Sequence, residues 1–133
     1  MTEQSTGLEF PNGVVEPEYD LWAEDVNIDP TGIFADIDAA DLAWRTKARK
    51  FVVEEVKKDI HEYWDKADYP LHLIKKLGDA DLLRDGMNLD SYEKMTPLAA
   101  GLVNMEMARG DGSVATIVGV QGGLALRSVL FCG

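Results

Sequence analysis

Residues 96–133 read TPLAAGLVNMEMARGDGSVATIVGVQGGLALRSVLFCG, and this stretch contains two successive helical patterns. The first predicted helix begins at Thr96–Pro97, a hydroxyl cap followed by a proline in the first turn, and ends one residue before Asp111. Apolar residues lie on both of its sides, so we expect it to be buried between neighbouring elements. Asp111 or Ser113 caps the second predicted helix, which extends to about Phe131.

A long helix is predicted upstream of this stretch. From about Asp38 to Ala67, apolar residues recur at spacings of three and four, which places them on one helical face. Asp36 or Asp38 can cap its N-terminus, because an aspartate oxygen accepts a hydrogen bond from an otherwise unpaired backbone N–H. Lysines and acidic residues occupy the opposite face, which is expected to be solvated.

A further short helix is predicted after Asp68. Pro70 stands where its missing N–H costs little, and Gly78 is the expected residue just beyond the helix C-terminus. A polar connection over residues 79–94 then leads to Thr96. Because no alternating strand pattern is present, the expected fold is all-α, a bundle of about four main helices.

Acidic residues are concentrated at the N-terminus. The 133 residues fit one domain and carry a net charge of −11. Residues 1–41 hold 11 Asp or Glu and no Lys or Arg, whereas residues 42–133 hold 13 acidic and 13 basic residues. Residues 1–37 show no sustained apolar period and are expected to form an extended acidic arm. Such an arm repels phosphate backbones and anionic headgroups, so neither nucleic acid nor a membrane surface is an expected partner.

The arm does not look like a targeting segment. It has neither the basic start of a secretory signal nor the arginines of a mitochondrial transit peptide. A lone cysteine, Cys132, is compatible with a reducing compartment. The expected localisation is therefore cytoplasmic.

Two segments superficially resemble metal-binding motifs, but neither has the complete set of ligands. His61 and His72 fall on different predicted helices and do not form a His-x-x-x-His pair. Residues 81–92 superficially resemble a calcium loop, but Leu83 and Tyr92 occupy places that require oxygen ligands. No metal site is predicted.

Catalytic and cofactor motifs are not found either. Gly119, Gly122 and Gly123 lack the spacing of a dinucleotide loop, and close packing of helices explains them better. Glu106 and Arg109 lie one helical turn apart, which favours a local ion pair over acid–base catalysis. No catalytic and no cofactor-binding residue is predicted in this chain.

The order of several short motifs resembles one known family. The stretch Leu98–Gly133 resembles helices three and four of the N-terminal domain of acyl-CoA dehydrogenases. The matching positions are Glu106, Arg109, Asp111 and Ser113 for the family's Glu…Arg-x-Asp-x-Ser pattern, Gly119-Val120-Gln121 for its Gly-Val-Gln, and, upstream, Tyr69-Pro70 and Leu77-Gly78. The resemblance covers residues 38–133, which gives an acidic arm over residues 1–37 followed by an acyl-CoA dehydrogenase N-terminal-like helical domain.

The resemblance implies a flavin enzyme of fatty acid metabolism. Members of this family are oxidoreductases that desaturate acyl-CoA thioesters between the α and β carbons with FAD. In the family, a middle β-domain and a C-terminal helical domain hold most of the flavin and carry the catalytic base. The chain therefore looks like the first third of such an enzyme, either a fragment or a truncated gene product, and is expected to be inactive alone. The resemblance also implies a homotetramer and an electron acceptor like electron-transfer flavoprotein.

Two departures bear on the substrate. The family's frequent Gly-Gly loop is replaced by Met87-Asn88-Leu89-Asp90. The closest likeness is to the glutaryl-CoA dehydrogenase branch, but the arginine that meets a distal carboxylate there falls at Ala115, and its serine partner falls at Gly119. An apolar wall cannot pair a second carboxylate, so a dicarboxyl substrate is disfavoured.

Small and apolar side chains on the last predicted helix are the candidate substrate site. At α-helical spacing one face carries Val114, Val118, Gln121, Ala125 and Ser128. By the resemblance, Gln121 lines the floor of the acyl pocket, and Gly122 and Ala125 are its neighbours. The expected substrate-binding residues are therefore Val118, Gln121, Gly122 and Ala125.

Two alternatives remain open at this point. These small residues also suit simple packing against another helix. The chain as a whole also fits a free-standing helical protein-interaction module that binds a partner through its acidic arm and has no catalysis.

Overall fold

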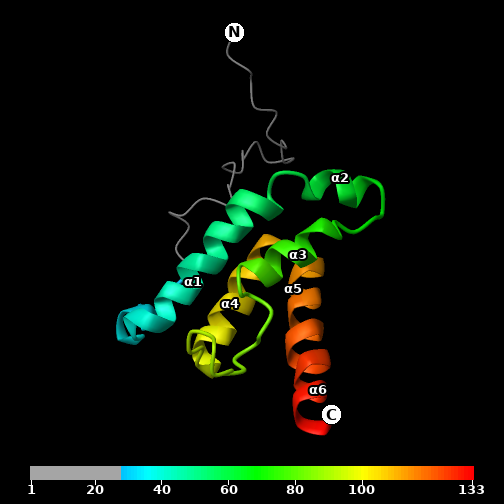
Figure 1. The fold of residues 1–133 in the computed structure, drawn as a ribbon. Coiled ribbons are helices and arrows are strands. Elements are labelled where there is room, and N and C mark those ends of the chain that lie inside the picture. The colour runs from blue at the N-terminus through cyan, green and yellow to red at the C-terminus, as the bar shows by residue number, and fades with distance from the viewer. Residues whose placement is uncertain (1–27) are drawn as a thin grey trace, which may run out of the picture.

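A computed structural model describes residues 28–133, and the regular elements in this range are all helical (Figure 1). Helix α4 (Pro97–Gly110) is central and packs against both α1 (Ala39–Phe51) and α5 (Gly112–Val118). The predicted all-α fold is confirmed. Most of the predicted acidic arm, residues 1–27, lies outside the described residues.

The end of the predicted arm forms a turn of helix. A short 3-10 helix, η1, spans Ile33–Asp36. Asp29 organises its start, because its carboxylate accepts hydrogen bonds from the backbone N–H groups of Ile33 and Phe34 at 2.9 and 2.7 Å. Residues 28–37 therefore contain a capped helical turn and are not fully extended.

The long helix predicted from Asp38 to Ala67 is interrupted. A π-helical segment, η2 (Val52–Val56), follows α1, and a turn separates η2 from α2 (Ile60–Asp65). The π turn holds more residues than an α turn, so apolar side chains spaced by four stay in line with the core. Val52, Val56 and Ile60 are accordingly all buried. The apolar period predicted the buried face correctly as far as Ile60, whereas Trp64 and Ala67 are exposed. The predicted continuity of the helix was wrong.

Side-chain caps define the helix starts. Asp38 accepts from Ala40 N at 3.1 Å, Thr96 from Ala99 N at 3.0 Å, and Asp111 from Val114 N at 2.8 Å. These bonds satisfy backbone donors in the first turns of α1, α4 and α5. They confirm Thr96 as a cap and select Asp38 and Asp111 from the predicted alternatives.

Helix α3 (His72–Asp79) ends later than predicted. Gly78 lies inside this helix, and Ala80 is the residue that follows it. The prediction of Gly78 as the terminating residue was wrong. Gly78 is part of the α-helix itself. The left-handed backbone conformation that follows the helix occurs at Asp81, with φ 55°.

A buried arginine orders the connection between α3 and α4. Arg84 donates to both carboxylate oxygens of Asp81, at 2.5 and 2.7 Å, and to the carbonyl oxygens of Met87 and Glu93. A guanidinium can make such forked contacts because its donors are planar and fixed. The predicted polar connection is therefore a defined loop rather than a loose linker.

One apolar core joins these elements. It contains the following buried side chains: Trp44, Ala48, Phe51, Val52, Val56, Ile60, Leu73, Leu77, Leu82, Met95, Ala99, Ala100, Val103, Met107, Val114 and Val118. Helix α4 and segment η2 approach closely at Gly110, where an added Cβ would lie 2.6 Å from a methyl group of Val52. The core thus contains one side of the C-terminal helix, and the rest of that helix does not belong to the core.

Candidate functional site

The C-terminal helix carries the candidate substrate residues. Helix α5 continues without a break into the π-helical segment η3 (Gly119–Leu126) and then α6 (Arg127–Cys132). Several large apolar side chains of this helix are exposed: Val120, Leu124, Val129, Leu130 and Phe131. Phe131 reaches 75% exposure. Several exposed large apolar side chains on one helix are typical of an interaction site or a ligand-binding wall.

Length and composition alone would also let this helix span a membrane. The stretch Gly112–Cys132 is the one such helix among the described residues, and 17% of its most apolar window is buried. Apolarity and length do not distinguish a lipid environment from a protein partner or ligand that covers the same face.

The four predicted site residues do not share one face. Val118 and Gly122 are buried against the body of the domain, whereas Gln121 and Ala125 are exposed. The reason is the π-helical turn of η3, because its wider turn aligns residues spaced by four. Val114, Val118 and Gly122 therefore form the inner row, and Gln121 and Ala125 lie outside it.

Gly122 is a point of very close contact. A Cβ at this position would collide with the Leu83 carbonyl oxygen and would lie 2.8 Å from the Asp85 Cβ. The glycine thus lets η3 lie directly on the loop between α3 and α4. Packing explains Gly122 fully, and any effect of Gly122 on a ligand would act through the position of the helix.

Asp85 fastens the loop to two helices. Asn104 of α4 donates to the Asp85 carboxylate at 3.0 Å, and Arg127 of α6 donates to the Asp85 carbonyl oxygen at 3.0 Å. A cavity of about 310 Å³ opens beside this junction, with residues 86–89 on one side and Arg127, Leu130 and Phe131 on the other. Its position places a hollow next to the exposed apolar side of α6.

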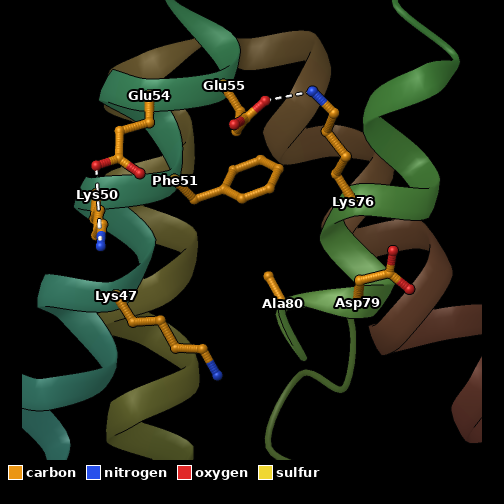
Figure 2. A pocket seen from close by; sticks show the side chains of 8 residues that line it. All are labelled: Lys47, Lys50, Phe51, Glu54, Glu55, Lys76, Asp79 and Ala80. Carbon is orange, nitrogen blue, oxygen red and sulfur yellow. Dashed lines mark hydrogen bonds and ion pairs between the residues drawn. The ribbon is translucent and has the colours of Figure 1, made fainter.

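Another cavity lies between α1, η2 and α3 (Figure 2). It measures about 460 Å³, and Phe51 and Ala80 contribute apolar surface to it. Charged side chains of both signs surround this surface (Figure 2). The ion pair Lys76–Glu55 spans its upper part, and the pair Lys50–Glu54 lies along one side, where α1 meets η2 (Figure 2). None of its lining residues belongs to the C-terminal helix.

The charges of this second cavity largely neutralise one another. The hydrogen bond from Lys76 lowers the pKa of Glu55, and the positive charges of Lys58 and Lys76 lower it further. A carboxylate held ionised by lysines is a poor proton acceptor. Glu55 is therefore poorly suited to act as a general base in this cavity.

The motif residues around Glu106 hold the helices together. Glu106 is fully buried, and its ion pair with Arg109 is confirmed at 3.8 Å. A closer partner comes from α1, where Arg45 Nε donates to the Glu106 carboxylate at 2.8 Å. Sequence reasoning missed Arg45, because the two residues are 61 positions apart in the chain and no local pattern pairs them.

Asp111 links three elements. Its carboxylate caps α5 and also accepts a hydrogen bond from Trp64 Nε1 of α2 at 2.9 Å. Burial raises the pKa of the nearby Tyr69, and the negative charge of Asp111 raises it further. Among the described residues, no group of three His, Cys, Asp or Glu side chains is placed to hold a metal ion.

Comparison with protein families identifies the domain that contains these residues. The family model "Acyl-CoA dehydrogenase, N-terminal domain" matches residues 38–133. The chain belongs to the acyl-CoA dehydrogenase family. Comparison with curated proteins gives no match, and neither does comparison with solved structures. In this acyl-CoA dehydrogenase domain, Glu106 and Asp111 act as the buried polar contacts between helices.

Proposed function

We propose that this chain is the N-terminal helical part of an FAD-dependent acyl-CoA dehydrogenase and supplies one wall of the acyl pocket. The observation that carries the proposal is the set of exposed apolar side chains on a helix whose inner face is already packed. The family match supports the enzyme class. The acyl-CoA substrate, the assembly with middle and C-terminal domains into a homotetramer, an acceptor like electron-transfer flavoprotein and a cytoplasmic location belong to the same proposal.

The exposed side of the helix suits an acyl chain. Ala125 adds little volume, and Gln121 can donate or accept a hydrogen bond from the same exposed side. Val118 and Gly122 contribute from the inner row by holding the helix at a fixed distance from the loop. In this arrangement Gln121 and Ala125 touch the substrate, and Val118 and Gly122 position them.

The described residues do not make a complete flavin site. A flavin needs donors for its ring edge and cationic or backbone groups for its pyrophosphate. The exposed side of the C-terminal helix offers mainly apolar side chains, and its arginine, Arg127, already contacts Asp85. We therefore assign FAD mostly to contacts outside this chain and derive no chemical step from its residues.

Flavin content and activity test the proposal together. The polypeptide encoded by the whole reading frame around this sequence should purify with bound flavin and reduce an artificial electron acceptor when acyl-CoA is added. Residues 1–133 alone should do neither, because proton abstraction requires a positioned base that the described residues do not supply. Stoichiometric flavin on residues 1–133, or no acyl-CoA oxidation by the whole polypeptide, would contradict the proposal. The second result would favour a helical interaction module.

A further inference from the structure

The cavity between α1, η2 and α3 has no part in the proposed acyl pocket (Figure 2). Its volume of about 460 Å³ lies within the range of small-molecule sites. Such sites combine apolar surface with a few polar groups that orient the ligand. The side chains that line this cavity supply both.

The floor of the cavity is apolar and is held in place by the core. The Phe51 ring extends from α1 towards α3, and the Ala80 side chain lies across from it (Figure 2). Because Ala80 has only a methyl group, space remains between the two. Phe51 belongs to the hydrophobic core, and Ala80 packs against that core. An aromatic ring of a ligand can stack on Phe51 or pack against its edge.

The carboxylates that line the cavity all have lysine partners. Glu54 pairs with Lys50 at 3.9 Å, and Glu55 pairs with Lys76. Asp79 pairs at 2.6 Å with Lys75, which lies outside the cavity. These acidic groups are therefore poorly placed to attract a cationic ligand.

Lys47 is different, because it makes no ion pair with a carboxylate of residues 28–133. Its ammonium group lies 4.4 Å from the centre of the Trp44 ring. The side chain extends from α1 towards the side of the cavity where Ala80 lies (Figure 2). An ammonium group has three N–H donors, so it can contact Trp44 and still donate to a carboxylate.

The surroundings of the cavity are positive, although the whole chain carries a net charge of −11. Counting the lining residues and their ion-pair partners, lysines exceed carboxylates by two. The lysines are Lys47, Lys50, Lys58, Lys75 and Lys76, and the carboxylates are Glu54, Glu55 and Asp79. A local excess of one sign raises the concentration of ligands of the opposite sign.

We propose that this cavity is a binding site for a small planar carboxylate. Its ring system lies against Phe51 and Ala80, and its carboxylate accepts a hydrogen bond from the Lys47 ammonium group. The site is independent of the proposed acyl pocket, because its residues lie on α1, η2 and α3 and in the residue that follows α3.

Three naphthalene compounds test the site on the full 133-residue chain. The probe is 2-naphthoate, which has a flat ring system and one carboxylate. At the usual efficiency of drug-sized ligands, its roughly 13 non-hydrogen atoms correspond to a dissociation constant of about 1 mM. Saturation-transfer NMR measures this affinity from the signals of the ligand. The neutral 2-naphthalenemethanol should bind more weakly, and the cationic 2-naphthylmethylammonium should bind most weakly.

Lys47→Gln should weaken the binding of 2-naphthoate about three- to fivefold, which is the usual strength of a partly exposed ion pair. It should change the binding of 2-naphthalenemethanol less than about 1.5-fold, because the alcohol carries no charge. Lys66→Gln is the matched control, since it removes one positive charge at an exposed position outside the cavity. Solvent and salt screen this charge, so the affinity for 2-naphthoate should change less than about 1.5-fold.

Ala80→Leu tests the apolar floor separately from the charge. The added carbons fill the space across from Phe51, so 2-naphthoate and 2-naphthalenemethanol should both bind at least about fivefold more weakly. Circular dichroism checks that this variant folds. If it does not fold, the two lysine variants and the three probes still decide the result.

The proposal is overturned if the wild-type chain does not bind 2-naphthoate at about ten times the expected dissociation constant. It is also overturned if Lys47→Gln and Lys66→Gln have equal effects, or if the alcohol binds as tightly as the carboxylate. Full binding by a folded Ala80→Leu variant would place the probe elsewhere on the chain and would likewise contradict the site.

Discussion

Gly119 and Gly122 stand in the same π-helical segment, but their surroundings differ. A Cβ at Gly119 would meet nothing within 4 Å, whereas a Cβ at Gly122 would collide with the Leu83 carbonyl oxygen. Both residues have helical neighbours, so the intrinsic preference for alanine is the same at the two positions. They therefore form a matched pair that separates packing from backbone propensity.

Gly122→Ala should lower the free energy of unfolding by about 1–3 kcal/mol, because the helix must move away from the loop. Gly119→Ala should leave it unchanged or raise it by up to about 1 kcal/mol, because alanine restricts the unfolded chain and fits the helix. Urea unfolding followed by circular dichroism measures both. Equal effects at the two positions would mean that η3 does not press on residues 83–85.

Single residues were predictable where their signal is local. The caps Thr96 and Asp111 follow from a hydroxyl or carboxylate directly before an apolar periodic segment. The exposed position of Gln121 was not predictable, because it depends on a π turn that an α-helical wheel does not contain. The contact of Arg45 with Glu106 joins residues 61 apart in the chain, and no local rule connects them.

At the scale of elements, Tyr69 lies between α2 and α3 and is subject to the negative charge of Asp111, the cap of α5. Its hydroxyl is buried and makes no hydrogen bond with the described residues. Burial, and secondarily Asp111, raises the pKa of Tyr69 above its usual value of 10.0. In the unfolded chain the tyrosine therefore loses its proton at lower pH than in the folded chain.

This difference predicts a loss of stability in alkali. Above pH 10 the unfolded state binds fewer protons than the folded state at this residue, so the free energy of unfolding falls as pH rises. Tyr69→Phe should remove this contribution, and at pH 7 it should leave stability unchanged or raise it by up to about 1 kcal/mol. Unfolding curves of both proteins at pH 7, 9 and 10.5 test this. An identical decline in the two proteins would show that Tyr69 ionises alike in both states.

The sequence predicts which segments are helical better than it predicts where a helix is interrupted. The apolar period identifies Val52, Val56 and Ile60 as buried whether or not the backbone ladder is regular. It does not reveal the π turn of η2 or the turn before α2, because both preserve the buried row. The connection after α3 was predicted only as polar, since its order depends on the contacts of Arg84 with Glu93 and with the ring of Trp44.

At the scale of the whole molecule, the C-terminal helix leaves one apolar side uncovered. Leu124 and Phe131 are 64% and 75% exposed on this side. An exposed apolar surface of this size favours association in water. Residues 1–133 should therefore sediment as species larger than a monomer when their concentration is raised.

Charged substitutions locate the surface responsible. Leu124→Glu combined with Phe131→Glu should shift the chain toward the monomer in sedimentation velocity experiments. Leu71→Glu is the matched control, because Leu71 is 69% exposed but precedes α3, and it should leave the association unchanged. A wild-type chain that stays monomeric at high concentration would contradict the expected association. Equal dissociation of both variants would show that the added negative charge, and not the loss of this apolar surface, weakens the association.

The most direct test of the acyl-pocket assignment is a chain-length series of acyl-CoA thioesters, measured on the polypeptide of the whole reading frame. Ala125→Leu adds three carbons on the exposed side of the helix, and one methylene of fit in an apolar pocket is worth about 1–3 kcal/mol. Long or branched substrates should lose at least about tenfold in kcat/KM, and short ones should be nearly unaffected. Thr116→Leu, an exposed change on the same helix, should leave the whole series unaltered. A uniform loss at all chain lengths, or no loss at any length, would contradict the proposed role of this helix.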